Sequence, residues 1–303
     1  MKLEGIHHIT AITGDAPGNL DFYARVLGLR LVKKTVNQDD PTVYHLFYAD
    51  EQGSPGADLT FFEYPGARRG RAGEGMAHRV VWRVGSQEAL AFWSERLAAE
   101  GVDAQRDDGA LVFSDPEGLG LELQVSDAAD PPLVAEAPDI APEHALLGFE
   151  GVRAYGADPA LSEPLLTQAL AFEPSGPGRY EARGAERGGW IAYDPPPSGP
   201  AESGAGTVHH VAWSSGLDEL EDWRGRALGA GARATPVIDR FYFRSVYFRE
   251  PSGVLFELAT RGPGFATDED AEHLGESLSL PPDYEHLREK LEKVLTPLPD
   301  PRA

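Results

Sequence analysis

The sequence predicts an α+β protein built from four βαβββ modules that form two incomplete β-barrels. Four segments of the chain repeat one order of elements, and 34 glycines and 25 prolines among 303 residues indicate many short elements joined by turns. The second and fourth segments also share a turn of the same length. In it, Phe113–Gly118 leads to Leu121–Leu123 just as Phe248–Gly253 leads to Phe256–Leu258.

Each module is expected to open with an alternating strand. These strands are Gly5–Ile12, Ala77–Val84, Leu147–Tyr155 and Thr207–Ser214. A helix over Pro17–Leu27 follows the first strand, with Asp15 as its candidate cap. The later strands are rich in β-branched and aromatic residues. They are Thr42–Tyr48, Leu59–Tyr64, Ala110–Ser114, Gly120–Gln124, Arg179–Ala182, Gly189–Tyr193, Ser245–Arg249 and Val254–Thr260.

The modules divide the chain into two halves and a tail. Residues 1–126 hold the first two modules (1–70 and 76–126), and residues 146–261 hold the other two (146–200 and 206–261). A segment rich in proline, alanine and aspartate, 127–145, links the halves. The tail, 262–303, is expected to place a helix over Asp283–Leu295 against the core, with a lid formed by Phe265–Leu280 as the alternative.

Composition excludes several classes of partner and site. With 27 basic and 49 acidic side chains the net charge is −22, so nucleic acid and anionic membranes are not expected partners. The chain has no cysteine, which leaves imidazole and oxygen ligands for any metal. No long apolar run or signal-like start is present, and a cytoplasmic location is therefore expected. Open sheet edges would also allow a homo-oligomer.

Two histidine pairs stand at equivalent places in the opening strands of the first and fourth modules. They are His7-His8 and His209-His210. A strand histidine is more often a satisfied core or surface residue, but alternation would turn one member of each pair into a shared cavity. His8 and His210, with Glu257 on the closing strand, would make a two-histidine, one-carboxylate set. This set leaves positions open on a metal and is diagnostic of non-haem Fe(II) oxygenases.

The other two modules lack this set. The second has His78-Arg79 and the third has Glu150-Gly151 at the equivalent places, and neither arginine nor glycine can ligate a metal. A competent site therefore requires the first and fourth modules to pair in one barrel. The second and third would then form a barrel whose site is lost.

Longer strings resemble a known family, the vicinal oxygen chelate superfamily of glyoxalases, bleomycin-resistance proteins and extradiol dioxygenases. They are most similar to its ring-cleaving (chloro)hydroquinone dioxygenase branch. The matching strings are Leu3–Gly14, Tyr44–Gly56, Val208–Trp213, Asp239–Arg249 and Glu250–Thr260, and the similarity continues into the Leu280–Pro282 tail.

The resemblance implies an Fe(II)-dependent ring-cleaving dioxygenase that acts on a small, hydroquinone-like aromatic substrate with O2. It implies iron, with Mn, Zn or Ni as alternatives, on His8, His210 and Glu257. It further implies an active site lined by His7, Thr10, His209, Arg240 and Tyr247, where a histidine or tyrosine could take a substrate proton and the arginine could stabilise a phenolate. Strand parity places His7 and His209 off the ligand face.

Glu63 leaves a second function open. It is expected to occupy in the first module the place that Glu257 holds in the fourth module. In glyoxalase-type members that carboxylate is a fourth ligand, which suits a Lewis-acid lyase or isomerase. A metal-free protein that binds an aromatic compound is the third alternative. His45 is expected to be structural.

Overall fold

The computed structural model describes residues 1–299 and contains two eight-stranded sheets, each made of two modules. The strand order is β14-β15-β16-β13-β1-β4-β3-β2 in the first sheet and β10-β11-β12-β9-β5-β8-β7-β6 in the second. The first and fourth modules therefore pair, as do the second and third. Central antiparallel pairs, β1 with β13 and β5 with β9, join the modules. The predicted fold class and pairing are confirmed.

The first sheet combines strands from both ends of the chain. Its strands are β1 (Ile6–Thr13), β2 (Arg30–Asn37), β3 (Asp40–Ala49), β4 (Asp58–Glu63), β13 (Val208–Ser215), β14 (Ile238–Asp239), β15 (Arg244–Arg249) and β16 (Leu255–Thr260). The second sheet uses the middle of the chain. Its strands are β5 (Ala77–Val84), β6 (Gln105–Asp107), β7 (Ala110–Ser114), β8 (Gly120–Val125), β9 (Phe149–Tyr155), β10 (Glu173–Gly176), β11 (Arg179–Arg183) and β12 (Gly188–Asp194).

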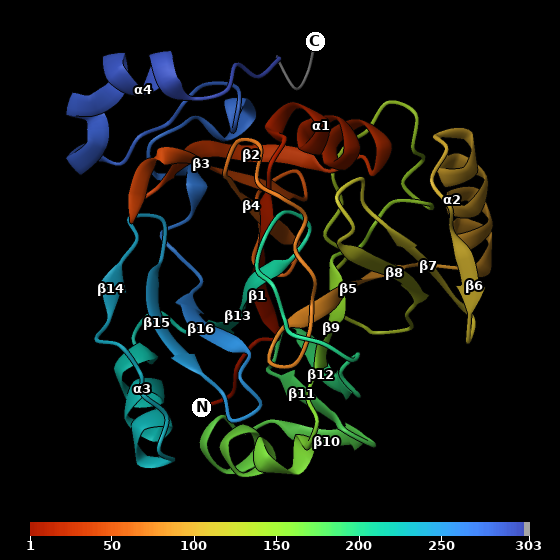
Figure 1. Cartoon of the computed structure of the whole chain (residues 1–303), viewed down its shortest axis with the longest axis vertical. Coiled ribbons are helices and arrows are strands. Elements are labelled where there is room, and N and C mark those ends of the chain that lie inside the picture. Colours follow the sequence, from red (N-terminus) through yellow and green to blue (C-terminus); the bar gives the residue numbers. More distant parts are fainter. Residues whose placement is uncertain (300–303) are drawn as a thin grey trace.

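Short helices cover the sheets (Figure 1). They are α1 (Ala16–Leu20), η1 (Asp21–Val26), α2 (Gln87–Ala99), η2 (Pro159–Leu161), η3 (Leu165–Ala169), α3 (Leu220–Gly229), η4 (Phe265–Thr267), η5 (Ala271–His273), η6 (Pro282–Leu287) and α4 (Arg288–Val294). The side chain of Asp15 caps α1 by accepting from the Gly18 amide. The helix predicted over Pro17–Leu27 continues as the π-type turn η1. None of the helices within residues 1–299 is long and apolar enough to cross a membrane.

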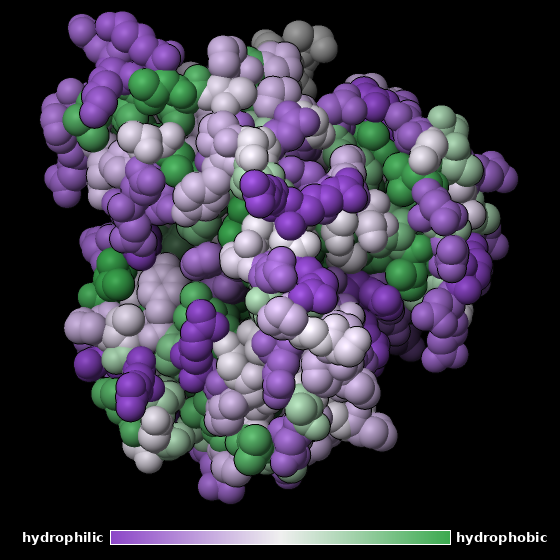
Figure 2. Space-filling model, in the orientation of Figure 1, coloured by the Kyte–Doolittle hydropathy of each residue, from purple (hydrophilic) through white to green (hydrophobic). Residues whose placement is uncertain are grey.

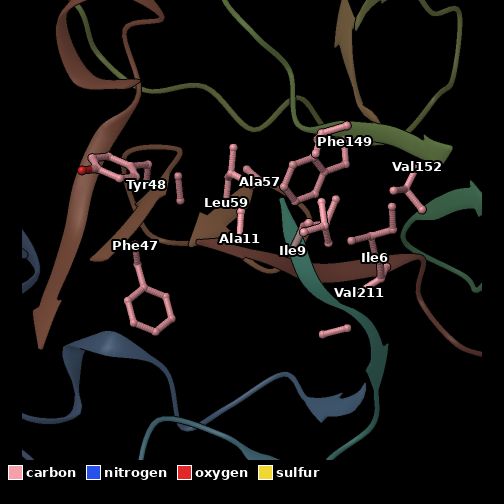
Figure 3. Packing of buried hydrophobic residues seen from close by; sticks show 14 of the residues in the cluster. Ile6, Ile9, Ala11, Phe47, Tyr48, Ala57, Leu59, Phe149, Val152 and Val211 are labelled. Carbon is pink, nitrogen blue, oxygen red and sulfur yellow. The ribbon is translucent and has the colours of Figure 1, made fainter. Parts of the chain in front are cut away.

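The two sheets share one apolar core at their central strands. Figure 3 shows Phe149 and Val152 of β9 beside Ile6 and Ile9 of β1, and all four side chains are almost fully buried. The view also shows that neighbouring β3 residues alternate across the sheet. Tyr48 and Phe47 point in different directions from β3, and Phe47 lines the cavity of the site described below. Polar side chains cover most of the face seen in Figure 2.

The tail packs along the β2 edge of the first sheet, where Leu278 bridges to Lys34, and is anchored there by a buried lysine. Lys33 Nζ donates to the Phe265 carbonyl (3.0 Å) and to Asp268 (2.8 Å), and it also pairs with Glu269. Phe265 contacts the Phe47 ring at a centroid distance of 4.9 Å. The segment proposed as a lid is thus fixed to the core, and the tail helix is η6 followed by α4.

Candidate metal centre

A cavity on the concave face of the first sheet holds the two histidines and the glutamate singled out in the sequence. Its volume is about 40 Å³, and its walls come from β2, β3, β4, β15 and the loop between β14 and β15. His8 lies on β1, His210 on β13 and Glu257 on β16. All three side chains are at most 4% exposed.

The three donor atoms converge at metal-ligand spacing. His8 Nε2 lies 3.2 Å from His210 Nε2, and Glu257 Oε2 lies 3.2 Å and 2.9 Å from these two nitrogens. Metal bonds of about 2.1 Å at right angles would place neighbouring ligand atoms ~3.0 Å apart. Glu257 Oε2 is buried and makes no hydrogen bond of good geometry, while Oε1 accepts from Ser245 Oγ at 2.5 Å. The residues therefore fit a divalent metal ion.

Electrostatics favour the protonation states that bind metals. Burial alone would raise the pKa of Glu257, but the imidazoles of His8 and His210 outweigh it and hold this pKa well below 4.5. Burial also lowers the pKa of His210 below 6.5. A carboxylate and a neutral imidazole are the ligand forms of these side chains.

A β-bulge brings each adjacent histidine onto the same side as its neighbour, contrary to the strict alternation expected from sequence. Between β1 and β13, Ile6 pairs with Trp213 and His8 with Ala212, so His7 is the extra residue. His209 is skipped in the same way on β13. As a result, His7 Nδ1 lies 2.9 Å from His8 Nδ1, and His209 Nδ1 lies 2.8 Å from His210 Nδ1.

These contacts are compatible with the ring tautomers that a metal ligand needs. If His8 presents Nε2 to a metal, its proton is on Nδ1 and is donated to His7 Nδ1. His7 is then protonated on Nε2, which lies 3.1 Å from the Thr260 carbonyl and can donate to it. Burial lowers the pKa of His7 to about 3, so it remains neutral and able to accept. In this arrangement His7 and His209 would orient the rings of His8 and His210.

Of the remaining predicted residues, Arg240 and Tyr247 line the same cavity, and Thr10 contacts one of the three ligands. Thr10 Oγ1 lies 2.9 Å from His210 Nε2. The Arg240 guanidinium makes a bidentate ion pair with Asp39 (3.1 and 3.0 Å), and its carbon lies 5.5 Å from the centre of the Tyr247 ring. Burial raises the pKa of Tyr247 well above 10, so its hydroxyl stays protonated. Arg240 and Tyr247 thus supply a fixed cation and a hydrogen-bond donor beside the three ligands.

The prediction that Glu63 is the counterpart of Glu257 is wrong. β1 pairs with β4 through Thr10 and Thr60, as β13 pairs with β16 through Ala212 and Glu257, so the counterpart of Glu257 is Thr60. Glu63 lies three residues further along, on the other face of the sheet. There it accepts from the Ala16 amide (3.2 Å) and from Thr296 Oγ1 (2.8 Å). It cannot reach the three ligands from that face.

His45 belongs to the cavity, although the sequence indicated a structural role. Its Nε2 lies 2.9 Å from Thr60 Oγ1, and its ring contacts Phe47 and Phe62. The strand register makes His45 the counterpart of Ser245, which bonds Glu257. Aligning the β3 and β15 strings by module could have found it.

Comparisons with known proteins agree with this geometry. A family model described as the "Glyoxalase/Bleomycin resistance protein/Dioxygenase superfamily" matches residues 5–123. The chain is 41% identical to "Putative ring-cleaving dioxygenase MhqO" of Bacillus subtilis over 98% of this chain and 97% of that protein. It is 32% identical to "Chlorohydroquinone/hydroquinone 1,2-dioxygenase" of Sphingobium indicum, over 97% and 96%. The crystal structure of a B. subtilis protein titled "putative dioxygenase" matches with a TM-score of 0.91, 40% identity and 98% coverage of both chains.

Proposed function

The chain belongs to the glyoxalase, bleomycin resistance protein and dioxygenase superfamily, and from this premise we propose that it is an Fe(II)-dependent ring-cleaving dioxygenase. The substrate would be a hydroquinone-like aromatic, cleaved with O2 beside a ring hydroxyl. A cytoplasmic location stays a prediction.

One observation carries the proposal. Glu257 Oε2 is buried and makes no hydrogen bond of good geometry, and the Nε2 atoms of His8 and His210 lie within 3.2 Å of it. Breaking a buried charge pair costs ~3 to 5 kcal/mol, so a cation bound beside this carboxylate would stabilise the fold. Two imidazoles and one carboxylate suit Fe(II) and leave coordination positions open for substrate and O2. When bound, the iron would supply those positions and one-electron chemistry toward O2.

The cavity walls suit an aromatic ring with an ionisable hydroxyl. Phe47, Phe62 and Phe243 supply apolar ring faces. Arg240 keeps its charge at every accessible pH and can stabilise a phenolate, while the protonated Tyr247 hydroxyl can donate to a ring oxygen. His7 and His209 hold the ligand rings in one tautomer, so the ligands need not reorganise when substrate binds.

Neither alternative function has a specific observation in its favour. A glyoxalase-like lyase or isomerase needs a fourth ligand, but the counterpart of Glu257 is Thr60 and Glu63 faces away. A metal-free binding protein gives no reason for two imidazoles and a carboxylate to converge with all three donor atoms within 3.2 Å.

Anaerobic loading with Fe(II), followed by O2 uptake with hydroquinone, chlorohydroquinone and catechol, tests the proposal. We expect stoichiometric O2 uptake with at least one hydroquinone and a ring-opened product. The hemithioacetal of methylglyoxal and glutathione serves as the comparison for the lyase or isomerase. Bound iron with no O2 uptake on any of the three aromatics would refute the proposal.

A further inference from the structure

A chain of hydrogen bonds leads from the three ligands to the cavity wall. Thr10 Oγ1 lies 2.9 Å from His210 Nε2 and 2.8 Å from Thr60 Oγ1. Thr60 Oγ1 in turn lies 2.9 Å from His45 Nε2. Both threonines are fully buried. The chain crosses from β1 through β4 to β3, so it depends on the pairing of these three strands.

His45 is the polar end of this chain in an aromatic wall. Its ring is held between Phe47 and Phe62, at centroid distances of 3.9 and 4.4 Å, which fixes its orientation. Nε2 is engaged by Thr60, and Nδ1 has no hydrogen-bond partner among residues 1–299. The side chain is partly exposed and lines the cavity. One ring nitrogen therefore belongs to the chain, and the other is free to exchange a proton with the cavity.

Burial keeps His45 neutral. It lowers the pKa of His45 well below 6.5, and the fixed charge of Arg240 lowers this pKa further. A neutral imidazole accepts at one nitrogen and donates at the other. With Nε2 as acceptor, Thr60 donates to His45 and accepts from Thr10. The Thr10 oxygen is then left as an acceptor at the ligand set, because a metal would engage the lone pair of His210 Nε2.

Four other polar side chains beside the ligands cannot take a proton there. Arg240 is permanently charged, and Tyr247 is already protonated. The Nδ1 lone pairs of His7 and His209 are engaged by His8 and His210. The chain through Thr10 ends at His45 Nε2, an acceptor nitrogen that takes part in none of these contacts.

We propose that Thr10, Thr60 and His45 relay the proton that a substrate hydroxyl loses at the ligand set to the outer part of the cavity. The inference rests on the proposed function. Thr10 Oγ accepts the substrate proton and passes its own to Thr60, which passes its own to His45 Nε2. His45 releases its Nδ1 proton to water, so one proton enters and one leaves, and no electron moves. His45 and Thr60 act through Thr10 and are positioning residues.

Two matched substitutions at Thr60 test the relay. Thr60→Val replaces the hydroxyl by a methyl group of similar size, and Thr60→Ser keeps the hydroxyl. Fe(II)-loaded protein is mixed anaerobically with hydroquinone and a pH indicator, and the rate of proton release is measured. We expect T60V to slow the release at least about tenfold, and T60S to keep it. His45→Phe should match T60V, and the double variant should be no slower than either, because both break one chain. Equal rates in T60V and wild type, or multiplied effects in the double variant, would overturn the relay.

A second measurement does not depend on turnover or on substrate. In full-length protein loaded with Zn(II), the ¹⁵N resonance of His45 Nε2 should have the shift of a hydrogen-bonded acceptor, lose it in T60V and keep it in T60S. An unchanged resonance in T60V would refute the chain. If no hydroquinone binds while this resonance responds as expected, the proposed function fails and the chain of hydrogen bonds stands.

Discussion

The two sheets of this protein share one strand arrangement but carry different side chains at the equivalent central position. Both have bulges at equivalent places, at His7 and His209 in the first sheet and at His78 and Glu150 in the second. In the second sheet, however, Arg79 stands in the place of His210, and Glu122 in the place of Glu257. Arg79 Nη1 donates to Glu122 Oε2 at 3.1 Å. A guanidinium attached to the chain thus neutralises the carboxylate, and no external cation is needed.

The space around this position is also filled in the second sheet. Gly151 replaces His8, and the Trp190 ring packs against it so closely that an added Cβ would lie 2.2 Å from the ring. The guanidinium carbon of Arg179 lies over the same ring, 4.1 Å from the Trp190 ring centre. A few side chains, with no change of fold, therefore separate an open metal centre from a closed structural pair.

The most direct way to break the comparison is His210→Arg, which imitates Arg79. The new guanidinium should pair with Glu257, so we expect complete loss of metal binding and O2 uptake with the fold preserved. Metal analysis after loading and a thermal melt measure the two effects. Retention of one metal ion per chain would contradict the comparison.

Paired Glu→Gln variants should affect different properties in the two sheets. Glu257→Gln removes a ligand and should cost at least about 100-fold in metal affinity. Glu122→Gln should leave metal binding unchanged and lower the free energy of unfolding by about 2 kcal/mol, because Arg79 loses its partner. Metal titration and urea denaturation of both variants distinguish these outcomes, and a metal deficit in E122Q would count against the assignment.

Acid should destabilise the metal-free protein mainly through histidines of the first sheet. His7, His45 and His210 have folded-state pKa values below 6.5, so the unfolded chain binds more protons and stability falls as the pH drops below 6.5. For His7 the loss continues to about pH 3. Each such group contributes up to about 1.4 kcal/mol per pH unit. Urea denaturation across this range gives the free energy of unfolding as a function of pH. Its slope should be smaller for His45→Phe than for wild type, and an equal slope would refute the lowered pKa of His45.

The smallest effect concerns an exposed ion pair, in contrast to the part-buried Arg79–Glu122 pair. Asp39 is 73% exposed and holds Arg240, which is only 17% exposed. Asp39→Asn should leave stability within about 1 kcal/mol of wild type. It should lower KM for hydroquinone severalfold, because Arg240 is then free for a substrate phenolate. Steady-state O2 uptake measures this effect, and a raised KM would show that Asp39 instead holds Arg240 in its productive position.

The sequence predicted the repeat and the ligand set because spacing within a strand and similarity between modules are local properties. The bulges at His7 and His209 were not predictable, since an extra residue exists only relative to the strand that pairs with it. The error at Glu63 has the same origin. Its apparent alignment with Glu257 was three residues out of register, and only the pairing of β1 with β4 identifies Thr60. The anchoring of Lys33 to Asp268 joins residues 235 positions apart, which no local pattern indicates.

The pairing of the outer modules also sets an order of assembly. The second sheet is continuous in the chain, from Ala77 to Asp194, whereas the first needs strands from both sides of it. During synthesis the second sheet can close before the fourth module has left the ribosome, and the first module must wait for its partner. His8 and His210 are 202 positions apart, so the ligand set is among the last contacts to form. The second sheet, which lacks the ligand set, is thus already folded when the first and fourth modules pair beside it.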